Sequence, residues 1–122
     1  MVPKMKLISK VFVIGLFLLS GCAVNSSIQP VASSGSGFDG AVYSGETSIV
    51  GKSSKGIDEY RLFQQGGTGF TQVESLKAAV YGQATNFCAK KEKALNPVQE
   101  TRSVPPHVLG NFPRFELLFE CN

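Results

Sequence analysis

Long hydrophobic runs are missing from this sequence of 122 residues. The apolar run of residues 11–19 has nine residues, and at about 1.5 Å each it falls short of the roughly 30 Å hydrocarbon core of a bilayer. A stable transmembrane helix is therefore not expected. The length limits the chain to one domain, which excludes an enzyme with separate cofactor and substrate domains. With no Trp, one His and three Cys, the chain also has too few His and Cys for us to expect a metal site.

The apolar run belongs to a segment, residues 1–21, that is typical of a secretory signal peptide. Three Lys residues among the first ten form a positive n-region ahead of the run. Directly after the run, Leu19-Ser20-Gly21-Cys22 resembles the lipobox of bacterial lipoproteins. The resemblance implies that Cys22 becomes the mature N-terminus and carries a thioether-linked diacylglycerol and an amide-linked acyl chain. The alternative is an ordinary signal peptide that is cleaved nearby and leaves Cys22 as a free thiol.

Acylation of Cys22 predicts firm attachment to a lipid bilayer, because each buried methylene contributes roughly 0.8 kcal/mol. Ala23 follows the Cys, at a position where Asp commonly signals retention in the inner membrane. The lipobox resemblance therefore implies the outer membrane, and we expect the domain to face the periplasm. Removal of residues 1–21 takes away three of the twelve Lys and Arg and none of the nine Asp and Glu. The mature chain is then formally neutral, which removes the support for a nucleic-acid partner.

Residues 22–40, which begin with the lipidated Cys, are predicted to form a flexible tether. The segment is rich in Ser and Gly and has almost no charge, so it has little apolar surface to bury. About 17 residues of such chain reach roughly 20–25 Å from the membrane surface.

Residues 41–122 are predicted to form one small α+β domain. We expect strands at residues 59–65 and 112–121, an edge strand at 98–104, and a short extra N-terminal strand at 47–50. A helix is expected between Thr71 and Asn96, where Pro97 follows. The β-α-β-β order gives a mostly antiparallel sheet that is covered on one face by a single amphipathic helix.

Local patterns support the helix and the last strand. Thr71 and Glu74 have the spacing of a capping box. The apolar residues that follow recur at helical spacing and form one stripe: Val73, Leu76, Val80, Ala84, Phe87 and Cys88. In the last strand, one face carries alternating apolar residues: Phe115, Leu117, Phe119 and Cys121. The stripe and this strand face are expected to pack together.

With Cys22 lipidated, two cysteines remain. Cys88 and Cys121 both point into the expected helix–sheet interface, and an exported protein folds in an oxidising compartment. We therefore predict a Cys88–Cys121 disulfide. The alternative is two reduced cysteines in the core. Because a bridged Cys88 is not a nucleophile and His107 is most simply a loop residue, we expect no catalytic residues.

Two loops are candidate binding sites. The loop of residues 104–113 combines prolines with apolar side chains, which is typical of a preorganised partner-binding surface, although the same side chains would also serve to cap the open end of the core. Its candidate residues are Pro105, Pro106, His107, Val108, Leu109 and Phe112. The second loop contains Gly66, Gly67 and Gly69 before the helix, where backbone N–H groups can hold an anion. It lacks the third Gly of a dinucleotide fingerprint, and turn chemistry is the simpler explanation.

Short motifs are spread over most of the mature domain. They are Asp58-Glu59-Tyr60, Gly67-x-Gly69, Leu76-Lys77, Ala84-x-x-Phe87-Cys88, Pro105-Pro106, Leu109-Gly-Asn-Phe-Pro113 and Phe119-x-Cys121. Together with the lipobox they resemble a family of small proteobacterial outer-membrane lipoproteins. The chain departs from the family pattern at Glu92, where Gly is usual, and at Glu59, where Thr is commoner. The resemblance implies export, lipid anchoring and the Cys88–Cys121 pairing, and it supplies no activity and no catalytic residue.

These observations favour a non-enzymatic envelope lipoprotein. It would need no cofactor and would act through contacts of the 104–113 loop with an unknown envelope protein. The alternative is a lipoprotein that binds an anion or another small ligand through the Gly66–Gly69 loop and the start of the helix.

Overall fold

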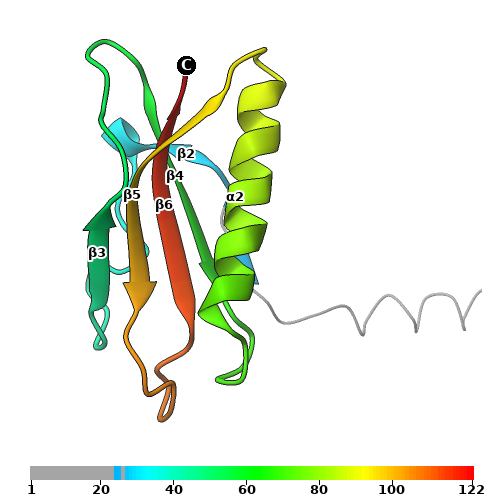
Figure 1. Cartoon of the computed structure of the whole chain (residues 1–122). Coiled ribbons are helices and arrows are strands. Elements are labelled where there is room, and N and C mark those ends of the chain that lie inside the picture. Colours follow the sequence, from blue (N-terminus) through cyan, green and yellow to red (C-terminus); the bar gives the residue numbers. More distant parts are fainter. Residues whose placement is uncertain (1–23, 26) are drawn as a thin grey trace, which may run out of the picture.

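A computed structural model describes residues 24–25 and 27–122 of the chain (Figure 1). These residues form an antiparallel sheet and one α-helix, α2, at Val73–Ala89. The strands lie in the order β1-β4-β6-β5-β3, and β2 also pairs with β4. The remaining bounds are β1 Val24–Asn25, β2 Gln29–Pro30, the 3-10 turn η1 Val31–Ser33, β3 Gly45–Ile49, β4 Glu59–Gln65, β5 Leu95–Ser103 and β6 Arg114–Cys121. The predicted α+β class with one α-helix is confirmed for this part of the chain.

Strand β6 is the centre of the sheet, with β4 on one side and β5 on the other. β5 pairs along its other side with β3, so β3 and not β5 is the edge strand. The prediction of an edge strand at residues 98–104 is therefore wrong. The polar residues of β5 have protein partners: Thr101 bonds Thr47 of β3 at 3.0 Å, and Glu100 pairs with Lys77 of α2 at 3.4 Å.

The hydrophobic core lies between α2 and the sheet. Its buried residues come mainly from α2 and β6: Leu76, Val80, Ala84, Cys88, Phe115, Leu117, Phe119 and Cys121, with Leu62 from β4. The helical period of 3.6 and the strand period of 2 bring these residues to one interface, as the sequence patterns predict. Val73 and Phe87 pack at the margin of the core and are only partly buried.

The opposite face of the sheet is also covered, by irregular chain and the short 3-10 turn η1 rather than by an α-helix. Arg114, Glu116 and Glu120 of β6 point to this face and are buried. The backbone N–H of Gly37 donates to Glu116 at 2.7 Å, and the N–H of Ser54 donates to Glu120 at 3.0 Å. The polar side of β6 therefore faces polar groups of the protein instead of water.

Residues 24–25 and 27–40 differ from the prediction of a flexible tether. β1 and β2 pair with β4, and Phe38 packs edge-on against Phe63 with 5.7 Å between the ring centroids. Gly37 is needed for this packing, because a Cβ there would lie 2.3 Å from the Phe63 ring. Small residues indicate flexibility when nothing packs on them. Here they let the backbone approach the sheet closely.

The start of α2 also differs from the sequence prediction. Its N-terminal cap is Gln72, and no side chain makes a capping hydrogen bond there. The predicted capping box of Thr71 and Glu74 is therefore not formed. The Glu74 carboxylate instead pairs with Arg102 of β5 at 3.1 Å, so a tertiary contact replaces the local one.

The end of α2 is a tight turn that contains Glu92. The N–H of Lys93 donates to the carbonyl oxygen of Cys88 at 3.0 Å, and the N–H of Glu92 donates to that of Ala89 at 2.9 Å, which is the Schellman pattern. Glu92 occupies the left-handed position of this motif, with φ of 57°. Gly is the residue that this conformation favours, because it has no Cβ to clash with the backbone.

Candidate functional site

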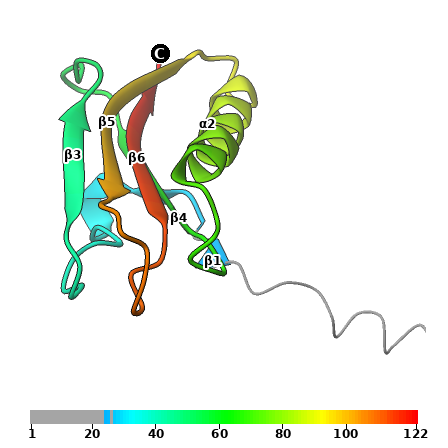
Figure 2. The ribbon, with the colours of Figure 1, turned by 60° about the horizontal axis from the view of Figure 1, so that its bottom comes forward.

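Three loops meet at one end of the sheet. They are residues 41–44 before β3, residues 66–72 between β4 and α2, and residues 104–113 between β5 and β6. We call these three loops the loop end. They lie together at the bottom of Figure 1, and Figure 2 brings the same end forward. The opposite end carries residues 50–58, residues 90–94 and the C-terminus (Figure 1).

Direct contacts join the three loops into one surface. The Tyr43 hydroxyl donates to the carbonyl oxygen of Leu109 at 2.9 Å, and Arg114 Nη2 donates to the carbonyl oxygen of Tyr43 at 3.0 Å. The 66–72 loop meets the 104–113 loop at Gly69, where a Cβ would lie only 2.6 Å from the carbonyl oxygen of His107. Gly69 is therefore required for this close approach.

The buried side chain of Asn111 holds the 104–113 loop in one conformation. Its amide nitrogen donates to the carbonyl oxygens of Val104 and Pro106, both at 2.9 Å, and its oxygen accepts from Arg114 at 3.3 Å. These bonds satisfy backbone groups that the prolines leave without a regular partner. The loop is thus ordered, as the prolines suggest, although Asn111 supplies the bonds that order it.

Leu109 stands at the tip of this loop in an unfavourable backbone conformation. Leu109 and Gly110 both have positive φ, 54° and 83°, and the N–H of Asn111 closes the turn onto the carbonyl oxygen of Val108 at 3.1 Å. Turns with two such residues favour Asn or Gly at the first position, and Leu is an outlier there. Neither burial nor backbone preference explains a Leu at this position. Residues held in such unfavourable backbone conformations are typical of functional sites.

The loop end carries most of the exposed large apolar side chains. Of ten such residues in the part of the chain that the structure describes, seven lie here: Val42, Tyr43, Phe70, Val104, Val108, Leu109 and Phe112. Phe70, Val42 and Leu109 are 98%, 94% and 90% exposed. The core cluster includes none of Val108, Leu109 and Phe112, which favours the surface interpretation of the loop over the core-cap interpretation.

The three loops of the loop end also lack acidic residues, Lys and Arg. Residues 41–44, 66–72 and 104–113 contain no Asp, Glu, Lys or Arg. The opposite end is strongly charged and exposed, with Lys52, Lys55, Asp58, Lys90, Lys91, Glu92 and Lys93. The domain is therefore polarised along its length, with one apolar end whose loops lack Asp, Glu, Lys and Arg and one end rich in Lys.

Two open hollows lie on the loop end. One, of about 440 Å³, is lined by residues of the 41–44 and 104–113 loops, including Val42, Pro105 and Leu109. The other, of about 370 Å³, shares Val42 and Leu109 and adds Phe112 and Arg114. Burial lowers the pKa of the Arg114 guanidinium, whose hydrogen bonds go to neighbouring carbonyl and amide oxygens. These hollows are open recesses between the loops, and both apolar and polar groups line them.

Three backbone N–H groups of residues 66–72 are used within the protein. The N–H of Gly66 donates to the carbonyl oxygen of Pro113 at 2.8 Å, and those of Phe70 and Thr71 donate to the hydroxyl and the carbonyl oxygen of Thr68, both at 3.3 Å. These three donors are not available to an anion, and the bonds from Phe70 and Thr71 to Thr68 are those of a turn.

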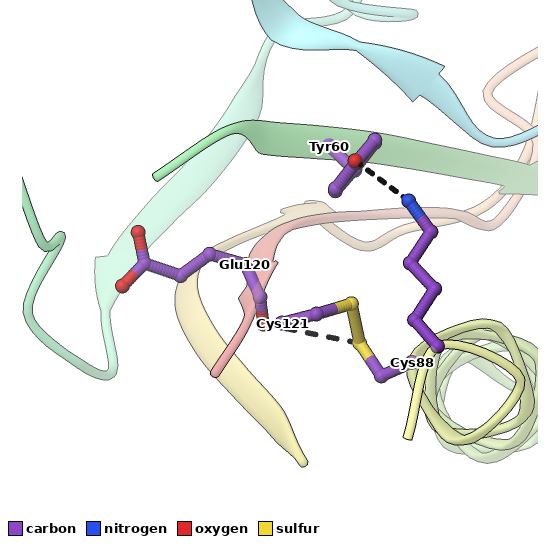
Figure 3. The surroundings of a disulfide bond; sticks show 5 residues. Tyr60, Cys88, Glu120 and Cys121 are labelled. Carbon is purple, nitrogen blue, oxygen red and sulfur yellow. Dashed lines mark hydrogen bonds between the residues drawn. A yellow bond between two sulfur atoms is a disulfide. The ribbon is translucent and has the colours of Figure 1, made fainter. Parts of the chain in front are cut away.

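The structure contains the predicted disulfide between Cys88 of α2 and Cys121 of β6, with Cα atoms 5.3 Å apart (Figure 3). Figure 3 shows Glu120, the preceding residue of β6, directed away from the sulfur atoms. The bridge lies toward the charged end, whereas His107 lies in the loop end, where its Nε2 bonds Ser103 Oγ at 2.8 Å. The structure therefore does not bring Cys88 and His107 together as a thiol–imidazole pair.

Glu120 is the most deeply buried carboxylate in the described residues. Burial by itself raises the pKa of Glu120, but hydrogen bonds from Ser54, Asn96 and Asn122 outweigh burial, and the pKa is lowered. The carboxylate therefore stays charged and fastens the 50–58 loop to β6. Its surroundings are those of a structural group, because the hydrogen bonds that it accepts come from neighbouring segments of the same domain.

Comparisons with protein-family models, curated proteins and solved structures found no match. Among residues 24–25 and 27–122, no helix has the length and apolar character needed to cross a bilayer. The same residues contain no cluster of three or more His, Cys, Asp and Glu side chains suited to hold a metal ion.

The sequence patterns indicate residues 104–113 and the Gly66–Gly69 loop as two separate candidate sites, and they do not indicate Val42, Tyr43 or Phe70. Val42, Tyr43 and Phe70 belong to the same surface, but they lie more than thirty residues away in the sequence. Phe70 was the available signal, because a large aromatic residue between Gly69 and Thr71 sits in a segment with turn composition and no apolar periodicity.

Proposed function

We propose that the protein is an outer-membrane lipoprotein, anchored through acyl chains on Cys22 and facing the periplasm, whose domain is a non-catalytic structural or binding module. The motif Leu19-Ser20-Gly21-Cys22, directly behind a positive segment and an apolar run, carries this proposal. The Cys88–Cys121 disulfide supports it, because structural disulfides persist in exported proteins and are rare in the cytosol.

The non-catalytic part of the proposal rests on the chemistry of the described residues. The thiol that the sequence offers as a nucleophile, Cys88, is oxidised in a bridge. The buried carboxylates of Glu116 and Glu120 are occupied by hydrogen bonds that hold surface segments on the sheet. The most distinctive surface is instead an apolar one, the loop end, which is suited to contact rather than to catalysis.

Acyl labelling in cells tests the anchor. With an alkyne analogue of palmitate, we expect the wild-type protein to be labelled and to fractionate with the outer membrane, and the Cys22→Ser variant to lose the label. The matched control is Cys88→Ala/Cys121→Ala, which removes the other two cysteines and is expected to keep the label. Mass spectrometry of the N-terminal peptide should show an acylated Cys22, and an unmodified N-terminus would refute the proposal.

A further inference from the structure

The first described strand brings the start of the domain to the loop end. Val24 of β1 pairs with Gln65, which directly precedes Gly66 of the loop end. In Figure 2, β1 lies beside the end of β4 at the forward end of the sheet. Cys22 precedes Val24 by two residues, and two residues of extended chain span at most about 7 Å. Covalent geometry therefore keeps any lipid on Cys22 close to the loop end.

The chain after Val24 gives the domain little freedom to move away from its anchor. β1 and β2 are hydrogen-bonded to β4. Further along, Glu116 accepts hydrogen bonds from Ser36 Oγ at 2.9 Å and from Gly37 N at 2.7 Å. The composition suggests a tether of about 17 residues between the anchor and the domain. Because the strands begin at Val24, the link from Cys22 to the sheet is only two residues long. A folded domain of 100 residues has a radius of gyration of about 13 Å, so this link is too short for a protein partner to fit between the loop end and the bilayer.

The chemistry of the loop end suits the interfacial layer of a membrane. Charged side chains are costly to insert into lipid, and the three loops contain no Asp, Glu, Lys or Arg. Val42, Phe70 and Leu109 expose nearly their whole side chains, and Tyr43 presents an aromatic ring whose hydroxyl is hydrogen-bonded. Aromatic residues are enriched at membrane interfaces, and apolar side chains there enter the boundary between headgroups and acyl chains.

We propose that the loop end rests on the bilayer that holds the Cys22 anchor, with Val42, Phe70 and Leu109 in contact with lipid. The partner of the exposed apolar loops is thus the membrane, and not an envelope protein. The Lys-rich end, with residues 50–58 and 90–94, then points away from the membrane into water. This inference rests on the proposed acylation of Cys22.

Single Trp probes test the proposal, because the chain has no Trp of its own. Phe70→Trp and Val108→Trp place the probe at two positions on the loop end. Ile57→Trp, at a side chain that is 39% exposed in the 50–58 loop, is the matched control at the opposite end. The full acylated proteins are reconstituted in vesicles of phosphatidylethanolamine and phosphatidylglycerol that contain brominated phosphatidylcholine, whose bromine atoms quench Trp on contact. Far-ultraviolet circular dichroism checks that each variant is folded.

We expect the fluorescence of Phe70→Trp and Val108→Trp to fall by about half or more, and that of Ile57→Trp by about a tenth or less. Equal, weak quenching at both ends would overturn the inference and would mean that the loop end faces water, where it is open to a protein partner. If quenching is weak at both ends but flotation and mass spectrometry show acylated protein on the vesicles, the proposed anchor stands and the proposed contact with lipid fails. If Cys22 carries no acyl chain, the proposed function fails, and with it this inference.

Discussion

The buried carboxylate of Glu116 is expected to hold the N-terminal segment on the sheet. Its side chain pairs with Arg61 Nη1 at 2.9 Å and accepts the hydrogen bonds from Ser36 and Gly37. Glu116→Gln preserves the shape of the side chain but removes the charge. Arg61 is then left without its counter-charge, and the N–H of Gly37 loses a charged acceptor.

The expected cost is about 3 kcal/mol of unfolding free energy. Removing one partner of a buried ion pair costs about 3–5 kcal/mol, and we take the lower end because water still reaches part of the Arg61 side chain, which is 13% exposed. For a domain of this size, that loss lowers Tm by roughly 12–24 °C. Urea unfolding followed by circular dichroism measures the free energy, and hydrogen exchange at the Gly37 amide reports whether the segment is released.

Two further variants make the measurement decisive. Glu46→Gln removes an exposed carboxylate from β3 and should change the free energy by less than about 0.5 kcal/mol. Adding Arg61→Met to Glu116→Gln removes the uncompensated charge and should recover part of the loss. If Glu116→Gln costs less than about 1 kcal/mol and leaves exchange at Gly37 unchanged, the carboxylate does not hold the segment, and the reasoning is refuted.

Three other changes test the fold. Cys88→Ala/Cys121→Ala opens a loop with a sequence separation of 33 and should cost about 3–4 kcal/mol in urea unfolding; a cost below about 1 kcal/mol would contradict the chain-entropy argument. Glu92→Gly removes the Cβ from a residue with left-handed backbone conformation at the end of α2 and should stabilise the protein by about 0.5–1 kcal/mol. A lower Tm would show that this backbone conformation does not reduce the stability of the wild type. Because the pKa of Glu120 is lowered by folding, its stabilisation is present above the unfolded-state value near 4.3 and is lost as the pH falls through the lower folded-state value. The Tm difference between wild type and Glu120→Gln should therefore be largest near neutral pH and shrink in acid, and a difference that does not depend on pH would exclude this linkage.

The elements with strong local patterns are the ones that the sequence predicts well. β4 has the bounds that the run of β-forming residues at 59–65 indicates, and the alternation in β6 places Phe115, Leu117 and Phe119 in the core. The disulfide follows from the same patterns, because Cys88 lies on the helix stripe and Cys121 on the apolar strand face. Each of these features depends on residues close in sequence, whose side-chain directions are fixed by helix or strand geometry.

Two of the predictions that fail concern polar residues, whose role depends on distant partners. The edge-strand prediction for residues 98–104 assumed that polar side chains face water, whereas Glu100 and Thr101 of β5 bond to α2 and β3. The capping box failed in the same way, because Glu74 finds Arg102 on the sheet. Polarity by itself does not distinguish a solvated side chain from one with a partner elsewhere in the protein.

Local periodicity is enough to predict the helix–sheet core and its disulfide, because it fixes which side chains share a face. The position of residues 27–40 depends on long-range contacts, since the hydrogen bond that fastens them joins Gly37 to Glu116, 79 residues apart. Tertiary contacts also bring three separate loops into one apolar surface, and they place this surface beside the strand that follows Cys22. Composition indicates which residues are small, apolar or charged, but pairing across the sheet decides which of them meet.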